Sequence, residues 1–234
     1  MAKELKAPEL MNYAMFCGGC GHGVLLRLIC ECLEEYGLDK KTIAAIGVGC
    51  SCHLKSGINV DLVQSPHGRA AAVATGIRRA EPDKFVFSYQ GDGDAYNIGL
   101  AETLNAAYRN ENICVFIINN GNFGMTGQQT ASSPKGRDCA ATGIPIKVPE
   151  LIAYSFTPAY IARGAVTTPA EINRLKGYIK NAIEAQLNGE GYSMVEVMCS
   201  CPTNWNLSPI DAKKRLVDEV IPYYSLGEIK KRGE

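Results

Sequence analysis

Amphipathic stretches and short apolar runs alternate along the chain. Between residues 22 and 36 apolar side chains recur every three or four positions, which predicts a helix with one buried face. Gly37 follows, and glycine accepts the left-handed dihedrals that end many helices. Uninterrupted apolar runs predict buried strands at 42–48, 84–89, 113–118 and 193–198, with a shorter strand at 160–163.

Helices are expected between these strands. Thr168-Pro-Ala-Glu171 has the sequence of a capping box with proline at the first helical position, and it opens a helix to about residue 186. The turn at 91–94 leads into a helix to about residue 109, and Ser208-Pro209 starts a last helix. A small-residue helix is expected at 68–80, mostly loop at 49–67, and a long loop at 121–149.

Strands that alternate with helices predict an α/β fold, a doubly wound and mostly parallel sheet with helices on both faces. The length suits one such domain over residues 1–234, with an N-terminal Cys-x-x-Cys loop and a C-terminal extension. Ligands of such sheets bind outside the carboxyl ends of the strands, which is where the glycine-rich loops of this chain fall.

The composition argues against two classes of partner. Lys and Arg total 24, as do Asp and Glu, so the formal charge is zero and nucleic-acid binding is not expected. No apolar run approaches the roughly 18 residues that cross a bilayer, so no membrane contact is expected. The first residues carry charges of both signs without an apolar core, so we expect no secretory signal and a cytoplasmic location.

Two polar turns follow neighbouring predicted strands. Gly91-Asp-Gly93 comes after one apolar run and Asn119-Asn120 after the next, with Asn120 28 residues beyond Asp92. Parallel strands joined by one helix bring such turns side by side, and carboxylate and amide oxygens suit Mg²⁺ bound together with a phosphate. Glycine backbone N–H groups and a helix N-terminus favour that phosphate. The alternative is that these residues only form turns.

Cysteine is unusually frequent, with ten residues. A reducing cytosol disfavours a disulfide framework, which leaves metal binding, redox chemistry or burial. Cys17 and Cys20 share a glycine-rich loop before a helix, and Cys50 and Cys201 lie at strand ends. These thiols leave zinc, a redox dithiol and an iron–sulfur cluster open. The remaining cysteines include three expected in the core and one without an assignment: Cys30, Cys32, Cys114 and, unassigned, Cys139.

Taken together, the motifs are specific. They are Phe16-Cys-Gly-Gly-Cys-Gly-His22, Gly47-Val-Gly-Cys50, His67-Gly-Arg69, Ala74-Thr-Gly76, Gly91-Asp-Gly-Asp-Ala95, Asn119-Asn-Gly-Asn-Phe-Gly-Met-Thr126 and Cys201-Pro-Thr-Asn-Trp205. With them the chain resembles the thiamine-diphosphate-binding beta subunit of the 2-oxoacid:ferredoxin oxidoreductases, of 2-oxoglutarate, 2-ketoisovalerate or pyruvate type. Gly127-Gln-Gln129 departs from the Gly-Gly-Gln usual in that family.

The resemblance implies thiamine diphosphate, with Mg²⁺ held by Asp92, Asn120 and the main-chain carbonyl of Asn122. It also implies a 4Fe–4S cluster, for which Cys52 or Cys199 could replace a neighbouring ligand, with zinc as the alternative. The implied cluster ligands are Cys17, Cys20, Cys50 and Cys201. Contacts to the cofactor are expected at Gly49, Cys50, Ser51, His67, Gly91, Asp92, Gly93, Asp94, Asn120, Asn122, Gly124, Met125 and Thr126.

His67 and Arg69 are the candidate catalytic residues. An imidazole can donate to a diphosphate or a substrate carboxylate, and a guanidinium can bind a carboxylate through two hydrogen bonds. Each has a structural alternative, as a buried histidine with its own partner or as a residue that caps and solvates its helix. Asp94 is expected to cap the following helix and touch the cofactor from the side, and Met125 to support the cofactor ring or line the wall.

The resemblance implies oxidative decarboxylation of a 2-oxoacid to CO₂ and an acyl-CoA, with electrons passed through the cluster to ferredoxin. It also implies an alpha subunit with a pyrimidine-binding domain, and gamma and delta subunits as further partners, in an anaerobic metabolism. One alternative is a non-oxidative thiamine-dependent decarboxylase or ligase, which would leave the cysteines unexplained. Another is a non-catalytic iron–sulfur or zinc module, which would leave Asp92 and Asn120 unexplained.

Overall fold

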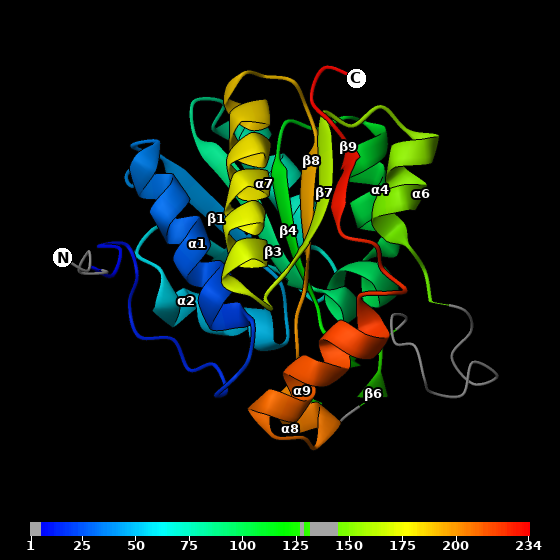
Figure 1. Cartoon of the computed structure of the whole chain (residues 1–234). Coiled ribbons are helices and arrows are strands. Elements are labelled where there is room, and N and C mark those ends of the chain that lie inside the picture. Colours follow the sequence, from blue (N-terminus) through cyan, green and yellow to red (C-terminus); the bar gives the residue numbers. More distant parts are fainter. Residues whose placement is uncertain (1–5, 127–128, 132–144) are drawn as a thin grey trace.

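A seven-stranded sheet forms the centre of the computed structural model, which describes residues 6–126, 129–131 and 145–234 (Figure 1). The strand order is β2-β1-β3-β4-β8-β7-β9, and every neighbouring pair is parallel except β7 and β9. The strands are β1 (Thr42–Ile46), β2 (Asp61–Gln64), β3 (Phe85–Gly91), β4 (Cys114–Asn119), β7 (Tyr160–Ala165), β8 (Ser193–Met198) and β9 (Gly227–Lys230). A small antiparallel pair joins β5 (Asn122–Phe123) to β6 (Gln129–Thr130).

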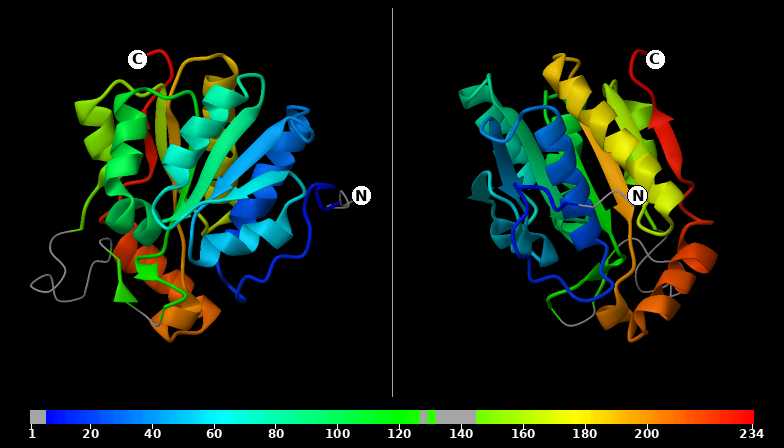
Figure 2. Two further views of the ribbon diagram at one scale, coloured as in Figure 1. Left: turned by 180° about the vertical axis from the view of Figure 1, so that it is seen from behind. Right: turned by 60° about the vertical axis from the view of Figure 1, so that its left-hand side comes forward.

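Helices cover both faces of the sheet, as predicted. Helices α1 (His22–Glu35) and α7 (Pro169–Leu187) lie on one face, and α3 (Ala70–Ala80), α4 (Leu100–Tyr108) and α6 (Val148–Ser155) lie on the other (Figure 2). Shorter helices lie near the carboxyl ends of the strands, namely α2 (Leu54–Gly57), α8 (Pro202–Trp205), α9 (Pro209–Arg215) and the turns η1 (Cys50–His53), η2 (Gly93–Ile98) and η3 (Leu216–Val220). The doubly wound α/β architecture is confirmed.

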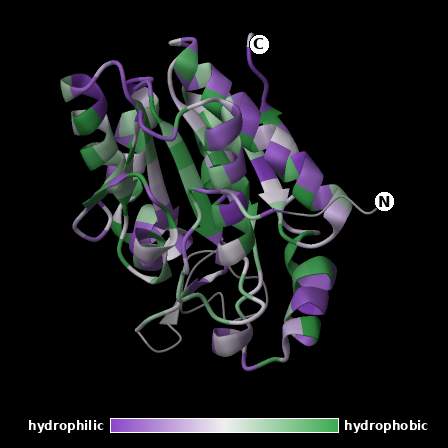
Figure 3. Cartoon of the chain, turned by 90° about the vertical axis from the view of Figure 1, so that its left-hand side faces the viewer, coloured by the Kyte–Doolittle hydropathy of each residue, from purple (hydrophilic) through white to green (hydrophobic). Residues whose placement is uncertain are grey.

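The core divides into two layers because the side chains of each strand alternate between its faces. Phe87 and Phe116 pack with α1 and α7 on one side of the sheet, whereas Val86 and Val115 pack with α3 and α4 on the other. Figure 3 shows mostly hydrophobic strands in the middle of the sheet and helices with mixed surfaces around them. Burial on both faces explains why these strands appear in the sequence as uninterrupted apolar runs.

Local signals set the ends of two helices as expected. The Thr168 hydroxyl accepts a hydrogen bond from the backbone N–H of Glu171 at 3.3 Å, and Pro169 is the first residue of α7. Gly37 takes a φ of +63° just after α1. None of the helices in the described ranges is long and apolar enough to cross a membrane.

Four expectations for the secondary structure are wrong. The segment 121–149, expected to be a long loop, contains the short strands β5 and β6 and the first residues of α6. The segment 49–67, expected to be mostly loop, contains η1, α2 and the edge strand β2. The last strand, β9, was not expected at all, because like β2 it lies at a sheet edge and has few buried apolar side chains. The helix expected from the turn at 91–94 is interrupted, since η2 is wound more widely than α4.

Candidate functional site

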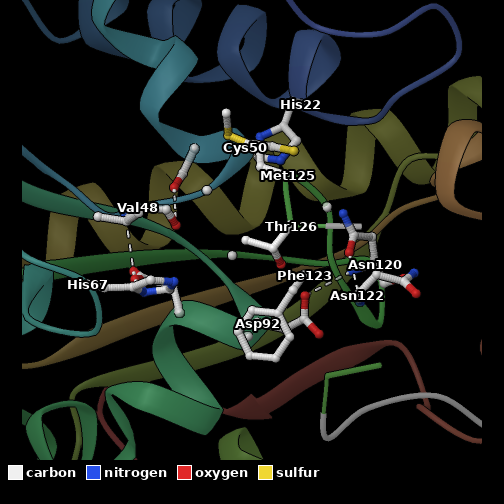
Figure 4. Close-up of a pocket in the computed structure, with 16 residues that line it drawn as sticks. His22, Val48, Cys50, His67, Asp92, Asn120, Asn122, Phe123, Met125 and Thr126 are labelled. Carbon is white, nitrogen blue, oxygen red and sulfur yellow. Dashed lines mark hydrogen bonds and ion pairs between the residues drawn. The ribbon is translucent and has the colours of Figure 1, made fainter. Parts of the chain in front are cut away.

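A cavity of about 190 Å³ lies at the carboxyl ends of β1, β3 and β4 (Figure 4). We call it the sheet-edge cavity. It brings together every residue that the sequence predicted to contact the cofactor. Its lining consists of His22, Val48, Gly49, Cys50, Ser51, His67, Gly91, Asp92, Gly93, Asp94, Asn120, Asn122, Phe123, Gly124, Met125 and Thr126.

The pairing of β3 with β4 places the two predicted turns side by side. The strands are parallel, with Gly91 opposite Ile118, so the residues that follow them leave the same edge of the sheet. The backbone N–H of Asn120 donates to Asp92 Oδ1 at 3.4 Å, although 28 residues separate them. The backbone N–H of Asn122 donates to Asn120 Oδ1 at 3.0 Å. Carboxylate, amide and carbonyl oxygens thus gather on one side of the cavity (Figure 4).

Asp94 connects three loops of the sheet-edge cavity. Its side chain is buried, and its Oδ1 accepts from the backbone N–H of Gly68 at 2.7 Å and of Val48 at 3.4 Å. The same oxygen accepts from His67 Nδ1, and Oδ2 accepts from Gln90 Nε2 at 2.7 Å. The expected helix cap is absent, because the carboxylate points back to these loops instead of to the backbone of the helix.

His67 lies at the rim of the sheet-edge cavity, with 34% of its side chain exposed. When Nδ1 donates to Asp94, the neutral ring leaves Nε2 as an acceptor. The ring also meets Phe123 edge-on, with 6.4 Å between centroids. Arg69 lies outside the lining: its guanidinium pairs with Glu102 at 2.9 Å, and 45% of its side chain is exposed. The structure therefore places only His67 of the two catalytic candidates at the cavity.

A second cavity, of about 130 Å³, adjoins the first, and we call it the cysteine cavity. All four thiols that the resemblance implied as cluster ligands line it, whereas Cys52 and Cys199 do not. The lining is Met15, Phe16, Cys17, Cys20, Cys50, His53, Asn120, Gly124, Met125, Cys201, Pro202, Thr203 and Asn204. The three cysteines predicted to lie in the core are buried there, and Cys139 lies outside the described residues.

Burial favours the neutral form of two of these thiols, Cys20 and Cys50. Removal of water raises the pKa of Cys20 to about 12 and that of Cys50 to about 11, and neighbouring thiols such as Cys201 add to both shifts. Thiolates here would need a positive charge beside them. In the described part of the chain, no three His, Cys, Asp or Glu side chains are placed to hold a metal ion as they stand.

The two cavities share a wall made of Cys50, Asn120, Gly124 and Met125. Gly124 is required there because a Cβ at this position would lie 2.7 Å from Cys50 Sγ. Gly49, just before Cys50, has a φ of +105°, a backbone conformation that glycine adopts readily and other residues adopt rarely. The loop geometry that brings the cysteine to the shared wall therefore depends on two glycines.

His22 and Tyr89 form a buried pair beside the shared wall. His22 Nδ1 and the Tyr89 hydroxyl are 2.8 Å apart, and the imidazole stacks on Phe16 with 4.8 Å between centroids. Burial lowers the pKa of His22 to about 3, so its ring is neutral. From the sequence, His22 was expected either to orient the cysteine loop or to start a helix, and it is the first residue of α1. The sequence assigned no role to His53 or Asn204, although each lies three residues after a predicted cluster ligand, Cys50 and Cys201, and lines the same cavity.

Comparison with known proteins begins with a family model. Residues 47–197 match the model described as thiamine pyrophosphate enzyme, C-terminal TPP binding domain. The ketoisovalerate oxidoreductase subunit VorA of Methanothermobacter thermautotrophicus is 40% identical over 93% of this chain and 48% of its own length. The 2-oxoglutarate synthase subunit KorB of Archaeoglobus fulgidus is 32% identical over 86% of this chain and 75% of its own length. The chain thus spans about half of the first relative and most of the second.

Solved structures share the fold. A 2-oxoglutarate:ferredoxin oxidoreductase from Magnetococcus marinus, with 2-oxoglutarate, coenzyme A and succinyl-CoA bound, matches with a TM-score of 0.76 at 21% identity, covering 99% of this chain and 87% of that one. A thiamine diphosphate-dependent 4-hydroxybenzoylformate decarboxylase from Rhodococcus jostii matches with a TM-score of 0.53, covering 81% of this chain and 34% of that one. Because both are 21% identical, they bear on the fold alone.

Proposed function

Because this chain belongs to the family of thiamine-diphosphate-binding beta subunits of the 2-oxoacid:ferredoxin oxidoreductases, we propose that it carries the diphosphate-binding half of a site for oxidative decarboxylation of a 2-oxoacid. The observation that carries this proposal is the wall shared by the sheet-edge and cysteine cavities. A cofactor site on one side and a four-thiol site on the other suit a reaction whose electrons leave for an iron–sulfur centre.

The sheet-edge cavity fits a diphosphate with its magnesium ion. Asp92, Asn120 and the main-chain carbonyl of Asn122 would hold Mg²⁺, because carboxylate, amide and carbonyl oxygens are ligands of that ion. Gly91 leaves the backbone open just before η2, where N–H groups can approach a phosphate, whereas Gly93 makes room for the Phe123 ring, which a Cβ there would meet at 2.7 Å. Once bound there, thiamine diphosphate would supply the electron sink for decarboxylation.

The cysteine cavity fits a 4Fe–4S cluster on Cys17, Cys20, Cys50 and Cys201. Zinc is the weaker alternative. A single tetrahedral zinc would draw its sulfurs to about 3.8 Å from one another, given Zn–S bonds of about 2.3 Å. The spacing of the four sulfurs in the loaded complex would therefore distinguish zinc from a cluster. A cluster held by these four residues would supply one-electron transfer, with ferredoxin as the acceptor in our proposal.

His67 and Asp94 would act on protons and charge at the rim of the sheet-edge cavity. Because Nδ1 is bonded to Asp94, Nε2 is the ring nitrogen that can accept a proton from a substrate or diphosphate oxygen. Once protonated, Nε2 can donate a hydrogen bond to such an oxygen. Arg69 would take part only if it left Glu102, with which it pairs at 2.9 Å. We therefore propose that His67 acts on the protons of the substrate or cofactor directly. Arg69 would instead bind the partner subunit or a substrate carboxylate.

Another subunit would complete the active site in this proposal. The partner is an alpha subunit that brings the pyrimidine-binding domain, with gamma and delta subunits as further members, and coenzyme A takes the acyl group. The relative at 40% identity is named for ketoisovalerate and the one at 32% for 2-oxoglutarate. We place a branched-chain 2-oxoacid first among the substrates and 2-oxoglutarate second.

The proposal is tested on the complex that copurifies with this chain. Isothermal calorimetry should show thiamine diphosphate binding that depends on Mg²⁺, and absence of binding would refute the enzyme. A panel of 2-oxoacids, with coenzyme A and a viologen acceptor, should then bleach the visible absorption of the cluster. An active preparation without iron would support the non-oxidative decarboxylase instead. Asp61→Asn is the matched control for variants of Asp92, since Asp61 is an exposed carboxylate on β2.

A further inference from the structure

The side chain of Asn204 is a buried polar group of the cysteine cavity that has no role in the proposal above. Asn204 lies on α8, is 6% exposed, and lines this cavity together with the four thiols. Its Nδ2 is buried without a hydrogen-bond partner. Buried donors are nearly always paired, so an orphaned donor in a cavity indicates an acceptor that occupies the cavity when it is filled.

The position of this donor points to a sulfur acceptor. Asn204 Nδ2 and Cys50 Sγ both lie within 3.4 Å of one point, the place that a Cβ on Gly124 would take. The backbone N–H of Asn204 already donates to the thiol of Cys201. Asn204 is thus close to two of the four cysteines. Its backbone N–H is directed to Cys201, and its side-chain amide is directed to the space beside Cys50.

We propose that the side-chain amide of Asn204 donates a hydrogen bond to a sulfur of the iron–sulfur cluster and thereby raises the reduction potential of that cluster. This inference rests on the proposed cluster. The reduced cluster carries one more negative charge than the oxidised one, so a donor beside its sulfur stabilises the reduced form more. Asn204 is therefore a tuning residue and not a catalytic one.

The test is a redox titration of the copurified complex, followed by electron paramagnetic resonance. Asn204→Leu removes the donor at similar size and should make the midpoint potential more negative, whereas Asn204→Gln keeps an amide and should restore part of the shift. Asn206→Gly is the matched control, because Asn206 is exposed, two residues away, and has a φ of +53° that glycine accepts. Its potential should equal that of the wild type.

An unchanged potential in Asn204→Leu at full iron content would overturn the inference while leaving the cluster in place. A wild-type complex without any cluster signal would instead show that the proposed function itself had failed. If Asn204→Leu does not retain the cluster, the wild-type complex is labelled with ¹⁵N at asparagine side chains. Hyperfine coupling between a labelled nitrogen and the reduced cluster is then expected, and its absence overturns the inference.

Discussion

Replacement of Asp94 by asparagine should destabilise the chain although it changes only one atom. The carboxylate accepts four hydrogen bonds, from Val48, His67, Gly68 and Gln90, and it is 2% exposed. An amide can offer one acceptor oxygen in place of two, so its NH₂ group must face at least one of these donors. The bonds that remain also lose their charge.

The size of the effect follows from those bonds. Hydrogen bonds to charged groups are worth about 1.5–3 kcal/mol, so the one bond that the amide cannot make should by itself lower the free energy of unfolding by about 1.5–3 kcal/mol, and the weakening of the other three adds to that loss. For a domain of this size the melting temperature should fall by at least about 3 °C. Thermal unfolding followed by circular dichroism measures the change, with Asp61→Asn as the exposed control, which should stay within about 0.5 kcal/mol of the wild type. If Asp94→Asn had the same melting temperature as this control, the Asp94 carboxylate would not be what holds the three loops together.

Three further outcomes are expected. Gly124→Ala should lower the iron and sulfide content of the purified complex severalfold, because the new Cβ would lie 2.7 Å from Cys50 Sγ. Asp92→Ala should weaken Mg²⁺-dependent binding of thiamine diphosphate at least tenfold in calorimetry while the circular dichroism spectrum is retained. Hydrogen bonds from Lys176 and from a second lysine lower the pKa of Glu35, so the wild type should lose stability as the pH falls from about 5 through that lowered pKa. In Lys176→Met this loss of stability should be smaller. If chemical denaturation showed the same pH dependence in the variant as in the wild type, the Lys176–Glu35 interaction would not be its cause.

Elements buried on both faces could be predicted from the sequence, whereas edge elements could not. β3 and β4 are covered by helices on each side, so residues 85–89 and 114–118 are apolar or small and each run stands out. β2 and β9 lie at the two edges of the sheet, where one side of each strand has no partner and polar residues are tolerated. Their sequences therefore resemble loops, and only the pairing with β1 and β7 makes them strands.

The candidate site divides in the same way. Asp92 and Asn120 could be predicted because each follows a strand directly, and adjacent parallel strands deliver their ends to one place. The loop-connecting role of Asp94 depends on Val48, 46 residues before it, and the place of Asn204 depends on its nearness to Cys50 and Gly124. Contacts of this kind arise from the packing of loops, for which the sequence has no periodic signal.

The adjacent side chains of Asn119 and Asn120 have different structural roles. Asn119 is the last residue of β4 and Asn120 the first residue beyond it, and the two side chains have different partners. Asn119 Nδ2 donates to Glu196 at 2.9 Å, and Glu196 is a fully buried partner of Arg163. A buried ion pair needs hydrogen bonds to its remaining acceptor atoms, and Asn119 supplies one of them to the carboxylate of Glu196. Asn120 turns to the two cavities. The first asparagine thus anchors the turn from inside, and the second is the one that holds the metal ion in our proposal.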